Sequence, residues 1–354
     1  MRGAMPGLRR GGGRGRGTTA RRRLARALLA AGVGFLRRAR VRALFRESAW
    51  RRARLRGIGP VRLAAGIELD VAYAFWLQLR TRLLAEPPDE AFLPGRPGLP
   101  AIVPVPGIYE RWDCLLPLLR RLNREGFPVR PVRSLGRMRE PVGVLAARLA
   151  REVERLPEEE AVLLCHSKGG LVGRAAMLAA REPERIRRVI ALATPFRGST
   201  AALLVRHAPE LRALWPASRQ TVRLAAPTPF DDRMLSIVPR VDQAIARRND
   251  LPGIREIRLP LIGHHLVMRD PRVLLCIVAE LAETFGTRPP SREMRRAAGR
   301  PADRLGALLR GPVPGSRGLR SLRLRTYRLR SRGFRPRRPR PSGPPRRLRR
   351  LPAA

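Results

Sequence analysis

The sequence has almost no lysine, few cysteines and few histidines. Lys168 is the only lysine among 74 basic residues, so the rest are arginine. This skew is typical of a GC-rich coding genome, and a single arginine therefore carries little functional information. The three cysteines, Cys114, Cys165 and Cys276, lie far apart without metal-ligand spacing, and their odd, small number argues against a disulfide framework. They predict reduced, mostly buried thiols, as in a cytoplasmic protein.

Acidic residues are nearly absent from both ends of the chain. The one acid before residue 60 is Glu47, and none follows Asp303, while the whole chain has a formal net charge of +46. Segments of arginine, glycine and proline bury too little apolar surface to offset their conformational entropy. We predict a basic, partly disordered arm over residues 1–60, with an amphipathic helix in it, and a disordered tail over 287–354.

Long apolar runs are also missing. Residues 27–36 form a mostly apolar run, but it has only about half the length of roughly 20 residues that a helix needs to cross a bilayer. Two arginines follow them directly, where a signal peptide would have its cleavage site. We favour an amphipathic helix here, with a twin-arginine export signal as the alternative. Residues 61–84 are largely aliphatic and aromatic, but Glu68 and Asp70 argue against a membrane span. The segment predicts a helix that packs on the domain or lies on a membrane surface. The predicted location is cytoplasmic or peripheral to the inner face of the membrane.

A proline-rich linker ends near residue 100, and a regular alternation of strand and helix patterns follows it. Strands are expected at 101–105, 127–132, before Ser167, and at 186–193, 234–238 and 254–259. Helices are expected at 113–126, about 142–153, after Ser167, and at 271–285. This alternation predicts an α/β domain over 101–286, with a mostly parallel sheet between two layers of helices. Residues of about 200–230 are partly apolar without a strand pattern, which predicts a helical cap.

Residues 161–170 read Ala-Val-Leu-Leu-Cys-His-Ser-Lys-Gly-Gly. An apolar strand that breaks off at a serine and continues into a helix is the pattern of a nucleophile elbow. Strand and helix approach closely there, so the positions two before and two after Ser167 must be small. Gly169 meets the second requirement, and Cys165 stands at the first, where glycine is usual. Lys168 lies beside the predicted nucleophile.

The elbow resembles that of the α/β-hydrolase superfamily. The stretch Thr-Pro-Phe-Arg-Gly-Ser at 194–199 and the Gly-His turn at 263–264 are similar to turns of its lipase-like serine esterases. The resemblance covers about residues 101–286, roughly half of the chain. It implies the α/β-hydrolase fold and a serine esterase without metal or other cofactor. Its expected substrate is a lipid or another acyl ester, cleaved through an acyl-enzyme on Ser167.

A serine hydroxyl becomes a good nucleophile only when a base removes its proton, and a third group must orient that base. In this superfamily the chain order is serine, acid, histidine. His264 is the predicted base because it follows the last predicted strand, and His265 is the alternative. His166 is expected to point the other way along the turn, and His207 falls in the cap.

Asp242 is the predicted acid, because it follows the strand at 234–238 with the spacing of the family. Asp231 and Asp232 precede that strand and are expected to cap or solvate the turn. Asp250 lies late in a polar loop and is the fallback.

Acyl transfer also needs backbone donors aimed at the developing oxyanion. The amide of Lys168 is one candidate. The other is the amide of Ile108 or Gly107 in residues 106–112, the oxyanion loop, whose sequence Pro-Gly-Ile-Tyr-Glu-Arg-Trp is similar to that of bacterial lipase-like hydrolases. Pro106 has no N–H to donate. Side chains of this loop and of the cap are expected to bind substrate: Tyr109, Leu203, Leu204, Leu211 and Trp215.

Two other functions fit the same residues. An inactive hydrolase scaffold would bind anionic lipid or nucleic acid through its arginine-rich ends, and such phosphate contacts are salt-dependent and without sequence preference. The ends contain no recognisable nucleic-acid module. A related acyltransferase or thioesterase would use the same acyl-enzyme, and no sequence feature separates hydrolysis from transfer. The arms are also expected to make peripheral contact with anionic membranes.

Overall fold

The computed structural model describes residues 57–199, 202, 209–212, 214–216, 218–245 and 249–299. All of them belong to the first of two compact units, Met1–Gly311. The predicted arm before residue 57 and the tail beyond residue 299 lie outside this part of the chain, as do Leu203, Leu204 and His207. No helix in the described ranges is both long and apolar enough to cross a membrane.

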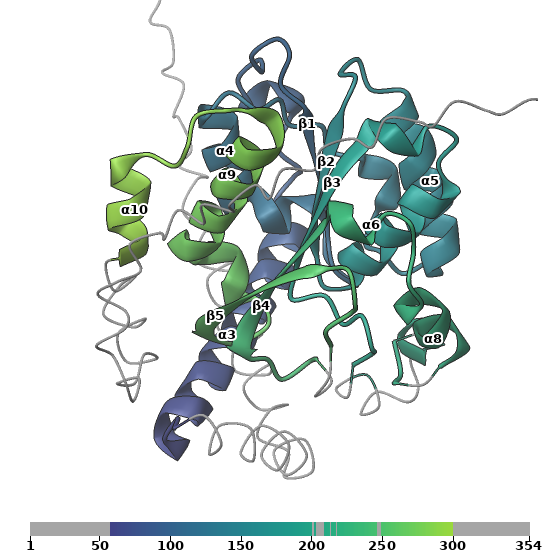
Figure 1. The fold of residues 1–354 in the computed structure, drawn as a ribbon. Coiled ribbons are helices and arrows are strands. Elements are labelled where there is room, and N and C mark those ends of the chain that lie inside the picture. Colours follow the sequence, from purple (N-terminus) through teal and green to yellow (C-terminus); the bar gives the residue numbers. More distant parts are fainter. Residues whose placement is uncertain are drawn as a thin grey trace, which may run out of the picture. The chain divides into compact units, whose positions relative to one another are not determined.

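The sheet has five parallel strands, which lie side by side in the order of the sequence (Figure 1). They are β1 (Ala101–Val105), β2 (Ala161–His166), β3 (Ile186–Leu192), β4 (Met234–Val241) and β5 (Arg255–Ile262). Every residue of β1 and β2 is buried, as expected for strands covered on both faces. Since all five strands run in the same direction, the loops that follow them emerge at one edge of the sheet.

Helices cover both faces of the sheet (Figure 1). One face packs against α3 (Pro60–Leu83), α4 (Leu116–Arg124) and α9 (Pro271–Phe285), and the other packs against α5 (Val142–Glu154) and α6 (Lys168–Ala179). Side chains alternate between the two cores, as the period of a strand requires. Ile102 and Val162 point into the first core, whereas Val103 and Leu163 point into the second.

Two segments differ from their predicted structure. Residues 127–132 contribute only an isolated bridge from Val129 to Ile102 in place of the predicted strand, because Pro128 and Pro131 have no N–H to continue a ladder. Helix α10 (Arg292–Gly299) lies in the predicted disordered tail. It forms because Ser291 Oγ accepts the Met294 amide at 3.1 Å and the Met294 side chain is buried in the core of α4 and α9.

The described part of the predicted cap contains two short helices, α7 (Pro209–Arg212) and α8 (Arg219–Ala225). The end of the cap is fixed to α6 by Arg174, which is fully buried and bonds Asp231 Oδ1 at 2.7 Å and the Ala226 carbonyl oxygen at 2.7 Å. Burial opposes ionisation of Asp231, but bonds from Thr228 and Arg174 hold its pKa below the usual value. Asp231 is therefore an anchor of the cap.

Helix α6 approaches the sheet more closely than a side chain would allow. A Cβ atom at Gly169 would collide with the carbonyl oxygen of Val105, and one at Gly170 would collide with Thr194. A Cβ at Gly173 would lie 2.8 Å from the sulfur of Cys165. The thiol at the usual glycine position of the elbow thus fits because the facing residue on α6 is itself a glycine.

Replacing Gly169 with alanine is expected to destabilise the fold by roughly 1–3 kcal/mol, because the added methyl overlaps backbone that cannot move aside. The matched control is Gly143→Ala in α5, where the same methyl meets no atom within 4 Å. Alanine there is expected to be neutral or to stabilise by up to about 1 kcal/mol. Urea unfolding of both variants measures the difference, and equal effects would contradict the close approach.

Candidate active site

Ser167 lies on a tight turn between β2 and α6. Its backbone adopts φ 51° and ψ −121°, a region that a residue with a Cβ rarely occupies and that costs free energy. The amide of Ser167 donates to the carbonyl oxygen of Leu192 at 2.9 Å, and Gly170 donates back to Ser167 at 3.1 Å. The turn is therefore held from both sides, and the hydroxyl stands at the edge of the sheet where the loops emerge.

His264 and Asp242 meet Ser167 at this edge. His264 Nε2 lies 2.8 Å from Ser167 Oγ, and His264 Nδ1 lies 2.9 Å from Asp242 Oδ2. An ionised carboxylate can only accept, so Nδ1 carries the proton and Nε2 is free to accept the serine hydroxyl. This is the arrangement in which a histidine removes the proton of a serine nucleophile.

Asp242 is fixed by its own backbone contacts. Its Oδ1 accepts the amides of Ala244 at 2.7 Å and Ile245 at 3.1 Å, which leaves Oδ2 for the histidine. The other acids considered lie elsewhere, since Asp231 pairs with Arg174 and Asp250 is exposed. The structure brings Asp242 and none of these alternatives to His264.

His265, the alternative base, faces away from the serine. Its Nδ1 lies 3.2 Å from Asp70 Oδ2, and its Nε2 lies 3.5 Å from Glu110 Oε1. Both ring nitrogens are thus directed at carboxylates, and of the two histidines it is His264 that contacts the serine hydroxyl.

One of the predicted oxyanion donors needs correction. The amide of Gly107 donates to Glu110 Oε2 at 2.7 Å within its own loop, so it is not directed at a substrate. Ile108 is the remaining candidate in the oxyanion loop. The amide of Lys168 begins α6 and has no acceptor within the helix, as for any first helical residue.

The side chain of Lys168 has a structural role. Its Nζ donates to the carbonyl oxygens of Met138 at 2.7 Å and Glu140 at 2.6 Å. Burial lowers the pKa of Lys168 to about 8. The lysine beside the nucleophile therefore ties the segment before α5 to the start of α6 and points away from Ser167.

The predicted substrate-binding side chains are only partly described. Tyr109 donates its hydroxyl to Glu210 Oε1 of α7 at 2.8 Å, which links the oxyanion loop to the cap. Leu211 and Trp215 pack into the core of α5 and α6, and Trp215 Nε1 donates to the Ala202 carbonyl at 3.0 Å. Substrate contact at Tyr109, Leu211 and Trp215 stays a prediction.

Asp70 of α3 is a site residue that the sequence analysis missed. It is fully buried, and its Oδ1 accepts the amides of His265 and Leu266, each at 2.7 Å. Its Oδ2 accepts Gln243 Nε2 at 2.6 Å. Burial alone would raise the pKa of Asp70, but the bonds and charge of His265 and the Leu266 amide lower it to about 2. One carboxylate thus holds the turn that carries His264.

The sequence of α3 contains a signal for the role of Asp70. It shares one helical face with Leu63, Gly66, Tyr73 and Leu77, all of them buried. A single acid on an apolar helical face must find partners within the protein, because burying an unpaired charge is very costly.

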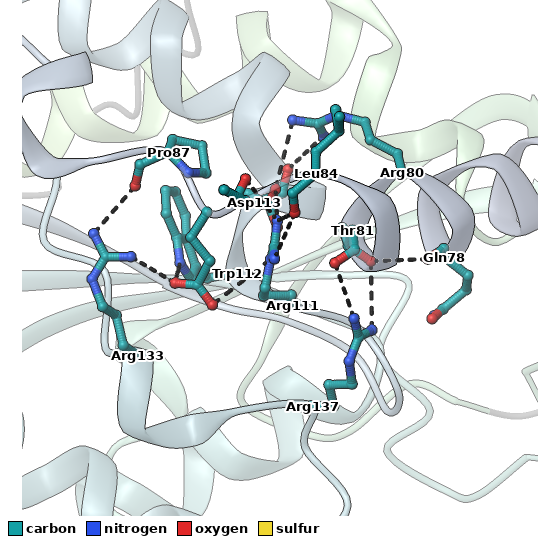
Figure 2. A network of polar contacts seen from close by, with 12 residues as sticks. Gln78, Arg80, Thr81, Leu84, Pro87, Arg111, Trp112, Asp113, Arg133 and Arg137 are labelled. Atoms are coloured by element: carbon teal, nitrogen blue, oxygen red, sulfur yellow. Dashed lines mark hydrogen bonds and ion pairs between the residues drawn. The ribbon is translucent and has the colours of Figure 1, made fainter. Parts of the chain in front are cut away.

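The C-terminal turn of α3 is tied to the oxyanion loop (Figure 2). Arg111 of this loop donates to the carbonyl oxygen of Leu84, the residue that follows the helix, at 3.2 Å, and Arg80 donates to the carbonyl oxygen of Asp113, just after the loop, at 3.2 Å. Arg137 donates to the carbonyl oxygen of Thr81 at 3.1 Å. Of the two expectations for residues 61–84, packing on the domain is the one that the structure shows.

The order of these loops defines the class of the fold. The oxyanion loop follows β1, the serine follows β2, the aspartate follows β4 and the histidine follows β5 of a parallel sheet. This is the α/β-hydrolase fold predicted from the sequence, and that prediction is confirmed. Among the described residues, no group of three or more histidine, cysteine or acidic side chains is arranged to hold a metal ion.

Comparison with solved structures finds hydrolases. Lipase B of Aspergillus fumigatus is 15% identical, with 62% of this chain and 61% of that chain covered and a TM-score of 0.49. The mature lipase BlEst2 of Bacillus licheniformis is 14% identical, with 55% and 96% covered and a TM-score of 0.45. The carboxylesterase CesB of Bacillus subtilis is 15% identical, with 54% and 86% covered and a TM-score of 0.36. No family model and no curated protein sequence matches this chain.

Replacing Asp70 with asparagine is expected to cost about 2 kcal/mol of stability at neutral pH. The folded pKa of Asp70 lies below the ordinary value, so its contribution is present above about pH 4 and is lost as the pH falls towards about 2. Urea unfolding of the full chain over this range measures the effect, and the two proteins should converge in acid. Glu68→Gln, an exposed change on the same helix, is the control. A difference that persists unchanged at about pH 2 would contradict the assignment.

Proposed function

We propose that the protein is a carboxylic ester hydrolase that cleaves a lipid or another acyl ester through an acyl-enzyme on Ser167. The chain of contacts from Asp242 through His264 to Ser167, at 2.9 and 2.8 Å, supports the proposal most directly. All three side chains are largely buried, so their interactions are stronger than they would be in water.

In the first half of the reaction, His264 Nε2 takes the proton of Ser167 Oγ while the oxygen attacks the acyl carbon. The ester carbonyl oxygen becomes an oxyanion, which the amides of Ile108 and Lys168 are proposed to stabilise. His264 then gives its proton to the leaving alkoxide as the bond between the acyl carbon and that oxygen breaks. The products of this half are an alcohol and an ester on Ser167.

In the second half, water takes the place of the alcohol. His264 removes a proton from the water, which attacks the acyl carbon, and then returns the proton to Ser167 Oγ as the carboxylic acid leaves. Asp242 holds His264 in the tautomer with a proton on Nδ1 and stabilises the imidazolium that forms in both halves.

The strained backbone at Ser167 also fits this role. A serine in ordinary helical or extended geometry would lie against neighbouring backbone, whereas the turn presents Oγ at the edge of the sheet. The structure supports this unfavourable conformation with hydrogen bonds and with the glycines of α6. Strain of this kind persists only where the surroundings over-determine it.

Ser167→Ala is expected to lower kcat for short and medium acyl p-nitrophenyl esters by at least about 10,000-fold, because no other group here forms the acyl-enzyme. A fluorophosphonate probe should label the wild-type protein on Ser167, as peptide mass analysis would show. Folded wild-type protein that stays unlabelled at Ser167 would overturn the proposal.

The two neighbouring histidines provide a matched pair of variants. His264→Gln should lower kcat about as strongly as Ser167→Ala, because the serine cannot act without its base and the loss of either residue disables the same catalytic unit. His265→Gln should retain most of the fluorophosphonate labelling at Ser167, since this ring does not contact the serine. If both folded variants lose labelling equally, the assignment of His264 as the base is wrong.

A further inference from the structure

Glu110 and His166 form a second carboxylate–histidine pair directly behind the serine. Glu110 lies in the oxyanion loop, and His166 is the last residue of β2, immediately before the nucleophile. His166 Nδ1 lies 2.8 Å from Glu110 Oε2, and both side chains are almost completely buried. None of the proposed reaction steps uses either group.

The contacts of His166 determine where its protons lie. Its Nε2 is 3.1 Å from the carbonyl oxygen of His264. A carbonyl oxygen only accepts hydrogen bonds, so Nε2 must carry a proton. Its Nδ1 faces Glu110 Oε2, which already accepts the Gly107 amide at 2.7 Å.

The surroundings of Glu110 favour its ionised form. Burial would raise its pKa, but the charge of and hydrogen bond from His166, the charge of His265 and the Gly107 amide lower it to about 2. An ionised carboxylate is an acceptor only, so His166 Nδ1 carries a proton as well. A ring protonated on both nitrogens is an imidazolium.

We infer that His166 is a buried imidazolium paired with the Glu110 carboxylate, and that this ion pair is a positioning device for the three loops of the site. Glu110 holds the Gly107 amide of the oxyanion loop. His166 is part of the strand that ends at Ser167, and its Nε2 holds the backbone of His264. The inferred charge of His166 does not depend on the proposed function, whereas the effect on turnover rests on it.

Other titratable groups lie close to the pair. His265 Nε2 lies 3.5 Å from Glu110 Oε1, and the other ring nitrogen of His265, Nδ1, faces Asp70. The ring of His166 lies 5.0 Å from that of His264 and 5.4 Å from that of His265, measured between centroids. Burial raises the pKa of the Tyr73 hydroxyl and of the Cys114 thiol, and the nearby Glu110 charge raises both further.

The pair acts on catalysis through geometry. The position of the Gly107 amide fixes the peptide that precedes Ile108, and the carbonyl of His264 fixes the backbone from which the catalytic ring projects. Acyl transfer depends on both groups, since a displacement of about 1 Å in a catalytic group can cost about 100-fold in rate. Glu110 and His166 thus position the site without contacting the substrate.

Nitrogen-15 NMR of the histidine rings tests the charge state without any substrate. The sample is the full chain with Ser167→Ala, and His166→Gln in the same background assigns the signals. At neutral pH, both ring nitrogens of His166 should carry protons, as their two acceptors require. A His166 ring with one unprotonated nitrogen at that pH would overturn the inference.

Glu110→Gln tests the positioning role. It should lower kcat by about 10- to 100-fold with little change in KM. It should also change the pH profile of kcat, because it removes a charge beside the backbone that carries His264. The control is Glu280→Gln, a buried carboxylate of α9 that pairs with Arg188 and Arg255 away from the site. This control should lower stability and leave the pH profile unchanged.

A double variant, Glu110→Gln with His166→Gln, covers the case in which the single change fails to fold. It replaces the ion pair by a neutral amide pair and leaves no unpaired charge, so it should be more stable than Glu110→Gln alone. A wild-type kcat and pH profile in either folded variant would overturn the positioning role. If the wild-type protein neither hydrolyses esters nor labels with fluorophosphonate, the proposed function fails, while the NMR result still decides the charge of His166.

Discussion

The close approach of helix α6 to the sheet is the constraint on which the site depends. Gly169, Gly170 and Gly173 face backbone or side chains that leave no room for a methyl group. This approach sets the sharp turn at Ser167 and places the amide of Lys168 at the start of the helix. It also explains how a thiol at residue 165 replaces the usual glycine, since the space that it needs has been left free on the helix.

Buried charge is the second organising feature, and it is arranged in pairs. Asp242 with His264, Glu110 with His166 and Asp70 with His265 form three carboxylate–histidine contacts within one small region. Isolated buried charges would be very unfavourable, whereas paired and hydrogen-bonded ones are tolerated. The pairs come from five segments of the chain: α3, the oxyanion loop, the elbow, the loop after β4 and the loop after β5. Their burial therefore couples the formation of the site to the assembly of the whole sheet.

The fold was predictable because its signals are local. Apolar runs and helical periodicity mark β1, β2, α5 and α9, and the order of the loops then indicates Ser167, Asp242 and His264. Asp70 and Glu110 were not predictable in the same way, because their partners are distant in sequence or visible only through side-chain directions. Residues 127–132 show a different limit: their apolar pattern predicts a strand, but two prolines remove the donors that a ladder requires.

Lys168 gives the chain an unusual chemical property. A protease specific for lysine has a single cleavage position in the whole sequence, one residue after the nucleophile. In the folded state that side chain is buried and bonded to two carbonyl oxygens. Cleavage there requires the elbow to open, so its rate reports the local opening of this turn separately from fraying elsewhere. The residue whose amide is proposed to stabilise the oxyanion thus also makes the integrity of the turn directly measurable.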